Sequence, residues 1–151
     1  MGEVLLPIAL LASGLAAGVL LGAAMGPVPF YMTLPPGQYV RAHAFAVGRY
    51  DPLQPACLLI TVVADAAIAV TGGPGRAPAI VGAVLAAAVV CVSLTRNVPV
   101  NRWVKSLDPD ALPPDWSSRD PRLFWARWNR IRTALAVLAL AANAVTAGVV
   151  Q

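Results

Sequence analysis

Residues 77–95 form a run of nineteen residues without a charged side chain, and this run constrains the fold more than any other feature. A helix needs about 20 apolar residues to cross a bilayer. Residues 4–25, 56–71 and 133–150 form three further runs of nearly this kind. Hydrophobic residues make up 58% of the 151 residues and charged residues only 12%, which is too apolar for an ordinary soluble domain. The sequence therefore predicts an all-α integral membrane protein.

The spacing of the runs predicts one antiparallel four-helix bundle over residues 1–151, with helices at about 4–26, 55–72, 77–97 and 122–150. The GGPG turn at 72–75 makes the second and third helices neighbours. Between the first and second helices we expect an irregular, proline-bounded segment at 30–34 and an interfacial helix at 37–49. An ordered loop is expected between the third and fourth helices.

Glycines recur every fourth residue on the first helix, at Gly14, Gly18, Gly22 and Gly26, and predict a packing face. A homo-oligomer is one use of such a face. The first run has no Lys or Arg before it, so we expect a retained helix rather than a signal peptide.

The net charge of +4 has a topological explanation. Ten of the eleven Lys and Arg residues lie in the first and third connections, and only Arg76 lies in the second. The positive-inside rule then places the first and third connections in the cytoplasm and both termini outside. We expect membrane lipid as a partner and no nucleic acid.

Two asparagines mark the end of the third helix. Asn97 and Asn101 lie four residues apart, and Pro99 between them removes the helical partner of the Thr95 carbonyl. Amides and a free carbonyl would then gather at one place, as in a polar site. The alternative is an ordinary helix end with solvated, capping asparagines.

The fourth helix presents polar side chains on one face. Trp125, Asn129, Arg132 and Asn143 share this face at helical spacing. An aromatic ring, two amides and a guanidinium in line suggest a binding site. The alternative is that Arg132 snorkels to the membrane edge.

Asp65 and His43 are the candidate proton acceptors. Asp65 lies ten residues after Pro55, about 15 Å into the second helix, where an ionisable side chain is a functional candidate. It could pair with Arg132, or it could make a structural hydrogen bond to a neighbouring helix. His43 shares a face of the interfacial helix with Tyr39 and could accept a proton near neutral pH, where histidines ordinarily titrate. The alternative is a solvated histidine without a role.

The sequence offers few metal or nucleotide ligands. One histidine and two helix-buried cysteines, Cys57 and Cys91, do not make the usual zinc, iron or haem sites. Walker and dinucleotide loops are also missing. We therefore expect no metal and no cofactor.

Three motifs carry a family resemblance: NVPVN at 97–101, DPDA followed by PPDW at 108–116, and W-x3-N-x2-RT at 125–133. Together they resemble the anthrone-oxygenase-like family of small four-helix membrane proteins. The motifs lie within residues 97–133, while length and helix layout agree over nearly the whole chain. Many relatives have a histidine where Asn129 stands, which weakens any mechanism that needs a base there.

The resemblance implies an enzyme that oxidises an anthrone-type, polyketide-like aromatic to a quinone with molecular oxygen as co-substrate and no cofactor. By matching positions it carries over Asn97, Pro99, Asn101, Trp116, Trp125, Asn129, Arg132 and Thr133. Removing a benzylic proton from an anthrone gives an enolate that reacts with oxygen directly. The protein must bind the substrate, deprotonate it and stabilise the oxyanion.

The resulting hypothesis gives each candidate a role. His43 or Asp65 takes the proton, and Arg132 stabilises the enolate oxygen together with three amides: Asn97, Asn101 and Asn129. Trp116 and Trp125 stack on the substrate, and Tyr39 and Asn143 also contact it. Two alternatives stay open: a redox-neutral cyclase or isomerase of a polyketide or terpenoid, and a non-enzymatic lipid-binding or accessory subunit.

Overall fold

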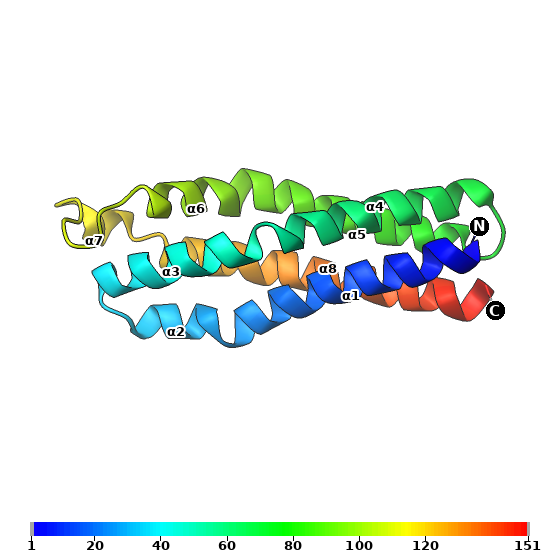
Figure 1. Cartoon of the computed structure of the whole chain (residues 1–151), viewed down its shortest axis with the longest axis horizontal. Coiled ribbons are helices and arrows are strands. Elements are labelled where there is room, and N and C mark those ends of the chain that lie inside the picture. The colour runs from blue at the N-terminus through cyan, green and yellow to red at the C-terminus, as the bar shows by residue number, and fades with distance from the viewer. Residues whose placement is uncertain (1, 151) are drawn as a thin grey trace.

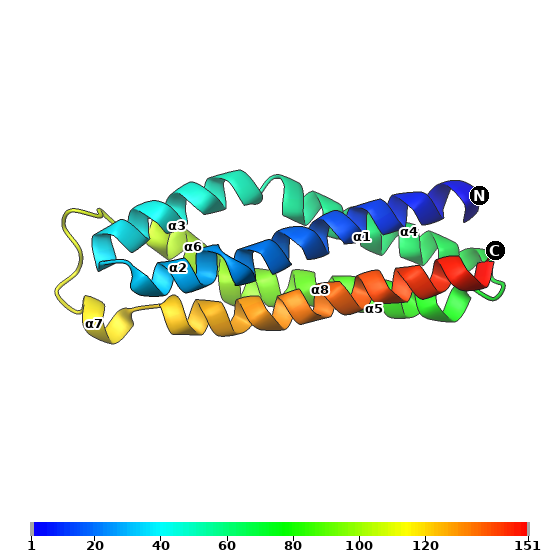
Figure 2. The same ribbon diagram turned by 90° about the horizontal axis from the view of Figure 1, so that it is seen from below.

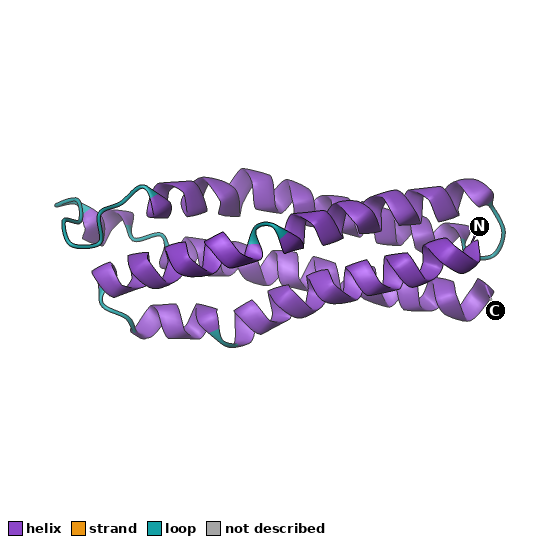
Figure 3. Ribbon diagram, in the orientation of Figure 1, coloured by secondary structure: helices purple, strands orange, loops and turns teal. Residues whose placement is uncertain are grey.

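The computed structural model describes residues 2–150, so Met1 and Gln151 of the expected 1–151 domain lie outside the description. Between these limits the chain is helical and contains no strand. The helices form four long rods that lie side by side (Figures 1 and 3). The rods are α1 (Gly2–Met25) with α2 (Pro27–Thr33), α3 (Pro36–Tyr50) with α4 (Leu53–Thr71), α5 (Arg76–Val92) with the π-helix η1 (Ser93–Asn97) and α6 (Val98–Lys105), and α8 (Arg122–Val150) preceded by the short α7 (Trp116–Arg119).

Each rod packs on two others. α1 contacts α4 and α8, and α5 contacts the same two helices. Both ends of the chain and the α4–α5 turn lie at one end of the bundle (Figures 1 and 2). Gly72 and Gly73 make this turn with φ angles of 79° and 81°, which residues with a Cβ rarely adopt. The predicted contact between the second and third membrane helices is confirmed.

Four helical segments are long and apolar enough to cross a membrane: Val4–Thr33, Leu53–Thr71, Arg76–Lys105 and Trp116–Val150. They agree with the four helices expected from the apolar runs. The all-α fold class is confirmed.

Prolines break the first two rods without unfolding them. Residues 30–33 belong to helix α2, so the expectation of an irregular segment there is wrong. Pro27 and Pro29 lie in the first turn of α2, where a missing N–H leaves no hydrogen bond unmade. At the other break, Pro52 lacks the N–H group that would bond the Gly48 carbonyl of α3, and Pro55 lacks the one that would bond the Asp51 carbonyl. The helix expected at 37–49 is present as α3, and it runs along the bundle as an extension of α4 (Figure 3).

The third rod continues past its expected end through a π-helix. In a regular α-helix the ring of Pro99 would clash with the carbonyl of Thr95. The chain widens instead: the N–H of Val98 donates to Ser93 O, a π-type bond, and the helix continues to Lys105. Single-turn π-helices of this kind often lie at functional sites.

Of the glycine stripe on α1, Gly14 is half-buried near Leu140, but Gly18 and Gly22 do not pack within the bundle. The added Cβ of an alanine at Gly18 or Gly22 would meet nothing within 4 Å, and both residues are exposed. Alanines fill the interior instead, with Ala9 and Ala16 at 0% and 1% exposure. The predicted packing face is therefore wrong for the interior of the bundle at Gly18 and Gly22.

Arg122 fixes α2 and α3 against the start of α8. Its Nη1 donates to the carbonyls of Tyr31 at 3.1 Å and Leu34 at 2.8 Å, and its guanidinium forms an ion pair with Asp120. The turn between α2 and α3 is thereby held at the end of the bundle where the polar residues gather.

Candidate functional site

Three helices meet at the side chain of Asn101. Its Oδ1 accepts a hydrogen bond from Trp125 Nε1 at 2.8 Å and lies 3.0 Å from His43 Nε2. Indole N–H only donates, so this bond fixes which end of the Asn101 amide is oxygen. An amide oxygen only accepts, so His43 Nε2 must carry the proton and donate it. The neutral imidazole therefore has its lone pair on Nδ1.

His43 is completely buried, which keeps its imidazole neutral. It lies in α3, outside the four candidate membrane spans. Burial is the main cause that lowers the pKa of His43 to about 4; the charge of Arg132 lowers it further, and the bond to Asn101 opposes the change. Nδ1 is buried and has no hydrogen-bond partner among the described residues. The sequence-based alternative of a solvated histidine is wrong.

Arg132 is a buried cation held by neutral groups. Its Nε and Nη2 donate to Asn129 Oδ1 at 3.0 and 2.8 Å, and its Nη1 lies 3.4 Å from Ser93 Oγ. The residue is 7% exposed, so the snorkelling alternative is wrong. Within residues 2–150 no carboxylate forms an ion pair with it. A buried charge that no carboxylate contacts directly is costly, and this suits the guanidinium to bind an anion. The Asp51 carboxylate, which lines the same two spaces, is a nearby charge of opposite sign.

Two spaces that share lining residues adjoin this polar group. The inner cavity has a volume of about 30 Å³, and its lining includes Leu20, Ala23, Tyr31, His43, Val47 and Trp125. The outer pocket has a volume of about 230 Å³, and its lining includes Pro55, Leu58, Leu59, Val90, Ser93, Leu94 and Val98. Both spaces are also lined by Asp51, Gln54, Asn101 and Arg132.

The outer pocket opens on the apolar flank of the bundle. Its walls come from α4 on one side and from α5, η1 and α6 on the other. Leu59 and Leu94 at this flank are 55% and 61% exposed on the surface that an apolar rod presents to lipid. A pocket with apolar walls and a few polar groups at one end is typical of small-molecule sites.

Of the predicted site residues, the structure gathers His43, Asn101, Trp125 and Arg132 around the two spaces. Asn129 lies behind Arg132 and orients it. Asn97 is fully buried and donates from Nδ2 to the Trp125 carbonyl at 3.3 Å. Asn97 and Asn101 are therefore not the solvated helix end that the sequence allowed.

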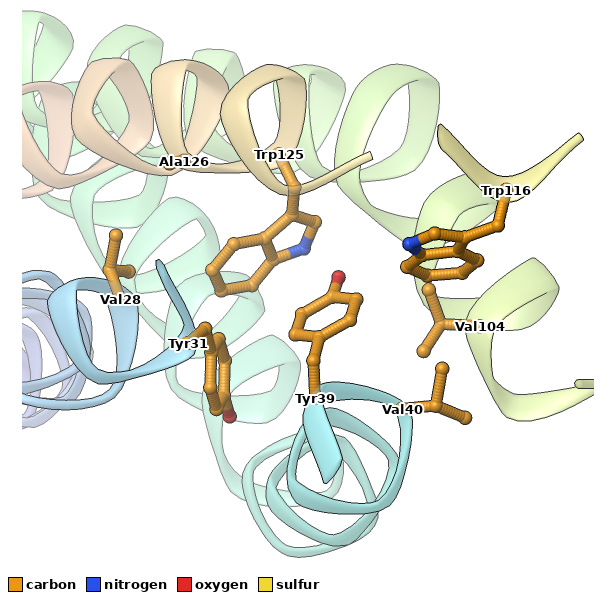
Figure 4. Packing of buried hydrophobic residues seen from close by; sticks show 8 residues of the cluster. All are labelled: Val28, Tyr31, Tyr39, Val40, Val104, Trp116, Trp125 and Ala126. Carbon is orange, nitrogen blue, oxygen red and sulfur yellow. The ribbon is translucent and has the colours of Figure 1, made fainter. Parts of the chain in front are cut away.

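Tyr39 and Trp116 belong to an aromatic cluster beside the site. Trp116 stacks on Trp103, with ring centroids 5.9 Å apart, and Tyr39 lies 5.3 Å from the His43 ring. Figure 4 shows Tyr31, Tyr39, Trp125 and Trp116 gathered at this end of the bundle. Neither Tyr39 nor Trp116 lines either space, so they support His43 and Trp125 rather than face a ligand in this structure.

Asp65 and Asn143 lie apart from the site. Asn143 Nδ2 donates to Asp65 Oδ2 at 3.3 Å, and both residues are fully buried. Asp65 follows Gln54 by eleven residues in α4, which is about 16 Å along the helix. The suggested pairing of Asp65 with Arg132 is wrong, because this part of α4 faces a distant turn of α8. The alternative of a hydrogen bond between helices is the one found.

Three residues at the site were missed in the sequence. Asp51 and Gln54 line both spaces from the break between α3 and α4, and Ser93 contributes from the π-helix. An amide in the first turn of an apolar helix was the sequence signal that could have identified Gln54 as a site residue. In the structure Gln54 is 7% exposed. Burial raises the pKa of Asp51, while the nearby charges of Lys105 and Arg132 act in the opposite direction.

Comparison with known proteins gives one match. The family model described as anthrone oxygenase matches residues 42–142. This range contains His43, Asn101, Trp125 and Arg132, the predicted residues that gather around the two spaces. No curated protein and no solved structure matches the chain.

Proposed function

Since the chain belongs to the anthrone oxygenase family, we propose that it oxidises a flat, hydrophobic anthrone-type substrate to a quinone with molecular oxygen. The family supports an oxygenase-type function. The two spaces around Arg132 support the proposed substrate class and mechanism.

The buried guanidinium of Arg132 is the observation that carries this proposal. An enolate oxygen is an anion that forms during the reaction, and a preoriented cation in a site of low dielectric stabilises such an oxyanion strongly. Asn129 holds the guanidinium from behind with two hydrogen bonds. The N–H groups of Arg132 that do not bond Asn129 are free to bind a substrate oxygen in the spaces that Arg132 lines.

The outer pocket supports an aromatic substrate. Its volume of about 230 Å³ lies just below the range of about 300–1,000 Å³ that is usual for small-molecule sites, which suits a compact, flat ring system. Leu58, Leu59 and Leu94 offer apolar surface to the rings. The opening on the lipid-facing flank lets a membrane-dissolved molecule enter without crossing water.

His43 is the base in this proposal. Its Nδ1 carries a lone pair and lacks a partner, so it can accept a proton. His43 lines the inner cavity and not the outer pocket, so the proposal requires that the benzylic carbon of the substrate reaches past Arg132 toward that cavity. A pKa of about 4 makes the imidazole a weak base in the empty site. The enolate that forms adds a negative charge beside the imidazolium, and opposite charges stabilise each other. Asp65, the other candidate, lies at a distant turn of α4.

The chemistry balances without a further oxidant. The enolate passes one electron to O2, and the resulting radical and superoxide join in a C–O bond. The peroxide takes the proton back from His43, and loss of water then leaves the second carbonyl. One anthrone and one O2 give one quinone and one water.

We propose that the reaction needs no resident metal or cofactor. In the part of the chain that the structure describes, no three His, Cys, Asp or Glu side chains come together as a metal site would need. The electron-rich enolate itself supplies the two electrons of the new C–O bond.

We also propose that the polar end of the bundle faces the cytoplasm, since the Lys and Arg residues of the first and third connections lie there.

Oxygen uptake by the detergent-purified protein, given an anthrone in the presence of a chelator, tests the proposal. We expect uptake with quinone formed by the wild type and by Arg130→Gln, which removes an exposed arginine on the same helix. Arg132→Gln should lower the rate by about 10²–10³-fold. Conversion without uptake would replace the proposal by a redox-neutral cyclase or isomerase. Absence of binding and conversion would favour the lipid-binding or accessory role.

A further inference from the structure

The inner cavity lies between the proposed base and the outer pocket. His43 lines only the inner cavity, whereas Asn101 and Arg132 line both spaces. A substrate that reaches past Arg132 thus meets the cavity before it meets the base. The cavity volume of about 30 Å³ has room for about two waters, since one water needs about 10–15 Å³ of such space.

The wall of the cavity carries polar groups that suit water. His43 Nδ1 is buried, carries a lone pair and has no hydrogen-bond partner among the described residues. Tyr50, Asp51 and Gln54 add a hydroxyl, a carboxylate and an amide to the same wall. His43, Tyr50 and Gln54 lie at i, i+7 and i+11 along the rod of α3 and α4, so they share one face. A buried water needs two to four polar partners, and this wall offers them.

The two charged groups of the wall have opposite signs. Arg132 and Asp51 both line the cavity. The carboxylate opposes an anion there, and the guanidinium opposes a cation. A guanidinium only donates hydrogen bonds and an ionised carboxylate only accepts them, so water, which does both, can serve either group. The charges therefore favour a neutral polar guest.

We propose that the inner cavity binds water and that this water relays the benzylic proton to His43 Nδ1, an inference that rests on the oxidation proposed above. As the C–H bond breaks, the water oxygen takes this proton and gives one of its own to Nδ1. One O–H bond forms and another breaks, so the water is regenerated, and the electron pair stays on the substrate as the enolate. A general base can act through one water in this way. The reverse relay returns the proton to the peroxide.

Water in the cavity can be detected by NMR without a substrate. In the wild type in detergent we expect nuclear Overhauser cross peaks between water and the methyls of Leu20, which is 1% exposed and lines the cavity. Val89 and Val104 are 0% exposed and line neither space, so their methyls should show none. Absence of the cross peak at Leu20, or equal cross peaks at all three residues, would overturn the proposal.

The relay itself is tested by the rate of enolate formation without oxygen. Protein and anthrone are mixed anaerobically in H2O and in D2O, and the absorbance of the enolate is followed. An anthrone deuterated at the benzylic carbon should react more slowly, which shows that C–H cleavage sets the rate. Transfer through water also moves a hydrogen of the solvent in this step, so we expect formation to be several-fold slower in D2O.

Two results would overturn the relay. Direct transfer from carbon to Nδ1 moves no solvent hydrogen and would give equal rates in H2O and D2O. A solvent isotope effect that survives His43→Gln and disappears in Asp51→Asn would make Asp51 the proton acceptor.

Filling the cavity should displace the water. Val47→Ile adds one methylene group to the cavity wall, and the matched control Val98→Ile adds one to the outer pocket only. We expect Val47→Ile to lose the cross peak at Leu20 and to slow enolate formation by about 10²-fold, with the Kd of the anthrone unchanged. Val98→Ile should change this Kd and keep the cross peak. Ala46→Val, at a partly exposed position of the same wall, replaces Val47→Ile if that variant does not fold.

The outcomes separate the two proposals. If Val47→Ile loses the cross peak and still oxidises the anthrone at the wild-type rate, the relay is wrong and the oxygenase function stands. If Leu20 contacts water but no anthrone is deprotonated, the proposed oxidation is wrong and only the water site stands.

Discussion

Asn101 Oδ1 lies 3.0 Å from His43 Nε2, and this contact joins α6 to α3 across 58 residues of sequence. The same oxygen accepts the indole N–H of Trp125. One amide oxygen thereby sets the tautomer of the imidazole, and a residue of the NVPVN motif positions the proposed base.

Replacing Asn101 by leucine should destabilise the protein and change which nitrogen of the His43 imidazole carries the proton. The buried N–H groups of His43 and Trp125 would each lose their acceptor, at a cost of about 1–3 kcal/mol per group. We expect a lower thermal midpoint in detergent, together with loss of the Nε2–H tautomer in the ¹⁵N spectrum of His43. If the wild-type protein shows its proton on Nδ1, the assigned role of Asn101 is wrong.

Acid should destabilise the protein through His43. The pKa of His43 in the folded state is about 4, below its ordinary value of 6.5. Between these values the unfolded chain binds more protons, so the free energy of unfolding falls as the pH drops from about 6.5 to about 4, by roughly 3 kcal/mol in all. Thermal midpoints measured across this range should show a steeper fall for the wild type than for His43→Gln. Parallel curves would contradict the assignment.

Arg132 should make the outer pocket selective for anions. A flat aromatic carboxylate should raise the thermal midpoint of the wild type more than its uncharged carboxamide does, because ligands that bind the folded state stabilise it. The difference should disappear in Arg132→Gln and persist in Arg130→Gln. Equal shifts with both ligands in the wild type would show that the guanidinium does not face the ligand.

Gly82→Ala should disturb the buried pair of Asp65 and Asn143 and leave the residues around Arg132 unchanged. A Cβ at Gly82 would lie 2.6 Å from Asp65 Oδ2, whereas one at Gly18 would meet nothing within 4 Å. We expect Gly82→Ala to lower the thermal midpoint and Gly18→Ala to leave it unchanged or raise it.

Asp65→Asn should keep full turnover per folded molecule, since Asp65 lies about 16 Å along α4 from Gln54. The measurement is the specific rate of the folded fraction after size-exclusion chromatography. A loss comparable to that of Arg132→Gln would restore Asp65 as a catalytic candidate.

The sequence by itself determined the four membrane helices, because a long uncharged apolar run in lipid has few alternatives to a helix that bonds its own backbone. It also determined which side chains of α8 share a face, since helical spacing puts Trp125, Asn129 and Arg132 together, whereas their burial became clear only in the structure. Only the tertiary structure decided which polar residues meet. His43, Asn101 and Trp125 come from three rods, and the rotation and register of each rod depend on breaks at Pro52 and Pro99 that local pattern does not measure. The packing of α4 against α8 likewise places Asp65 beside Asn143 and far from Arg132, because a contact between two helices depends on the position of both.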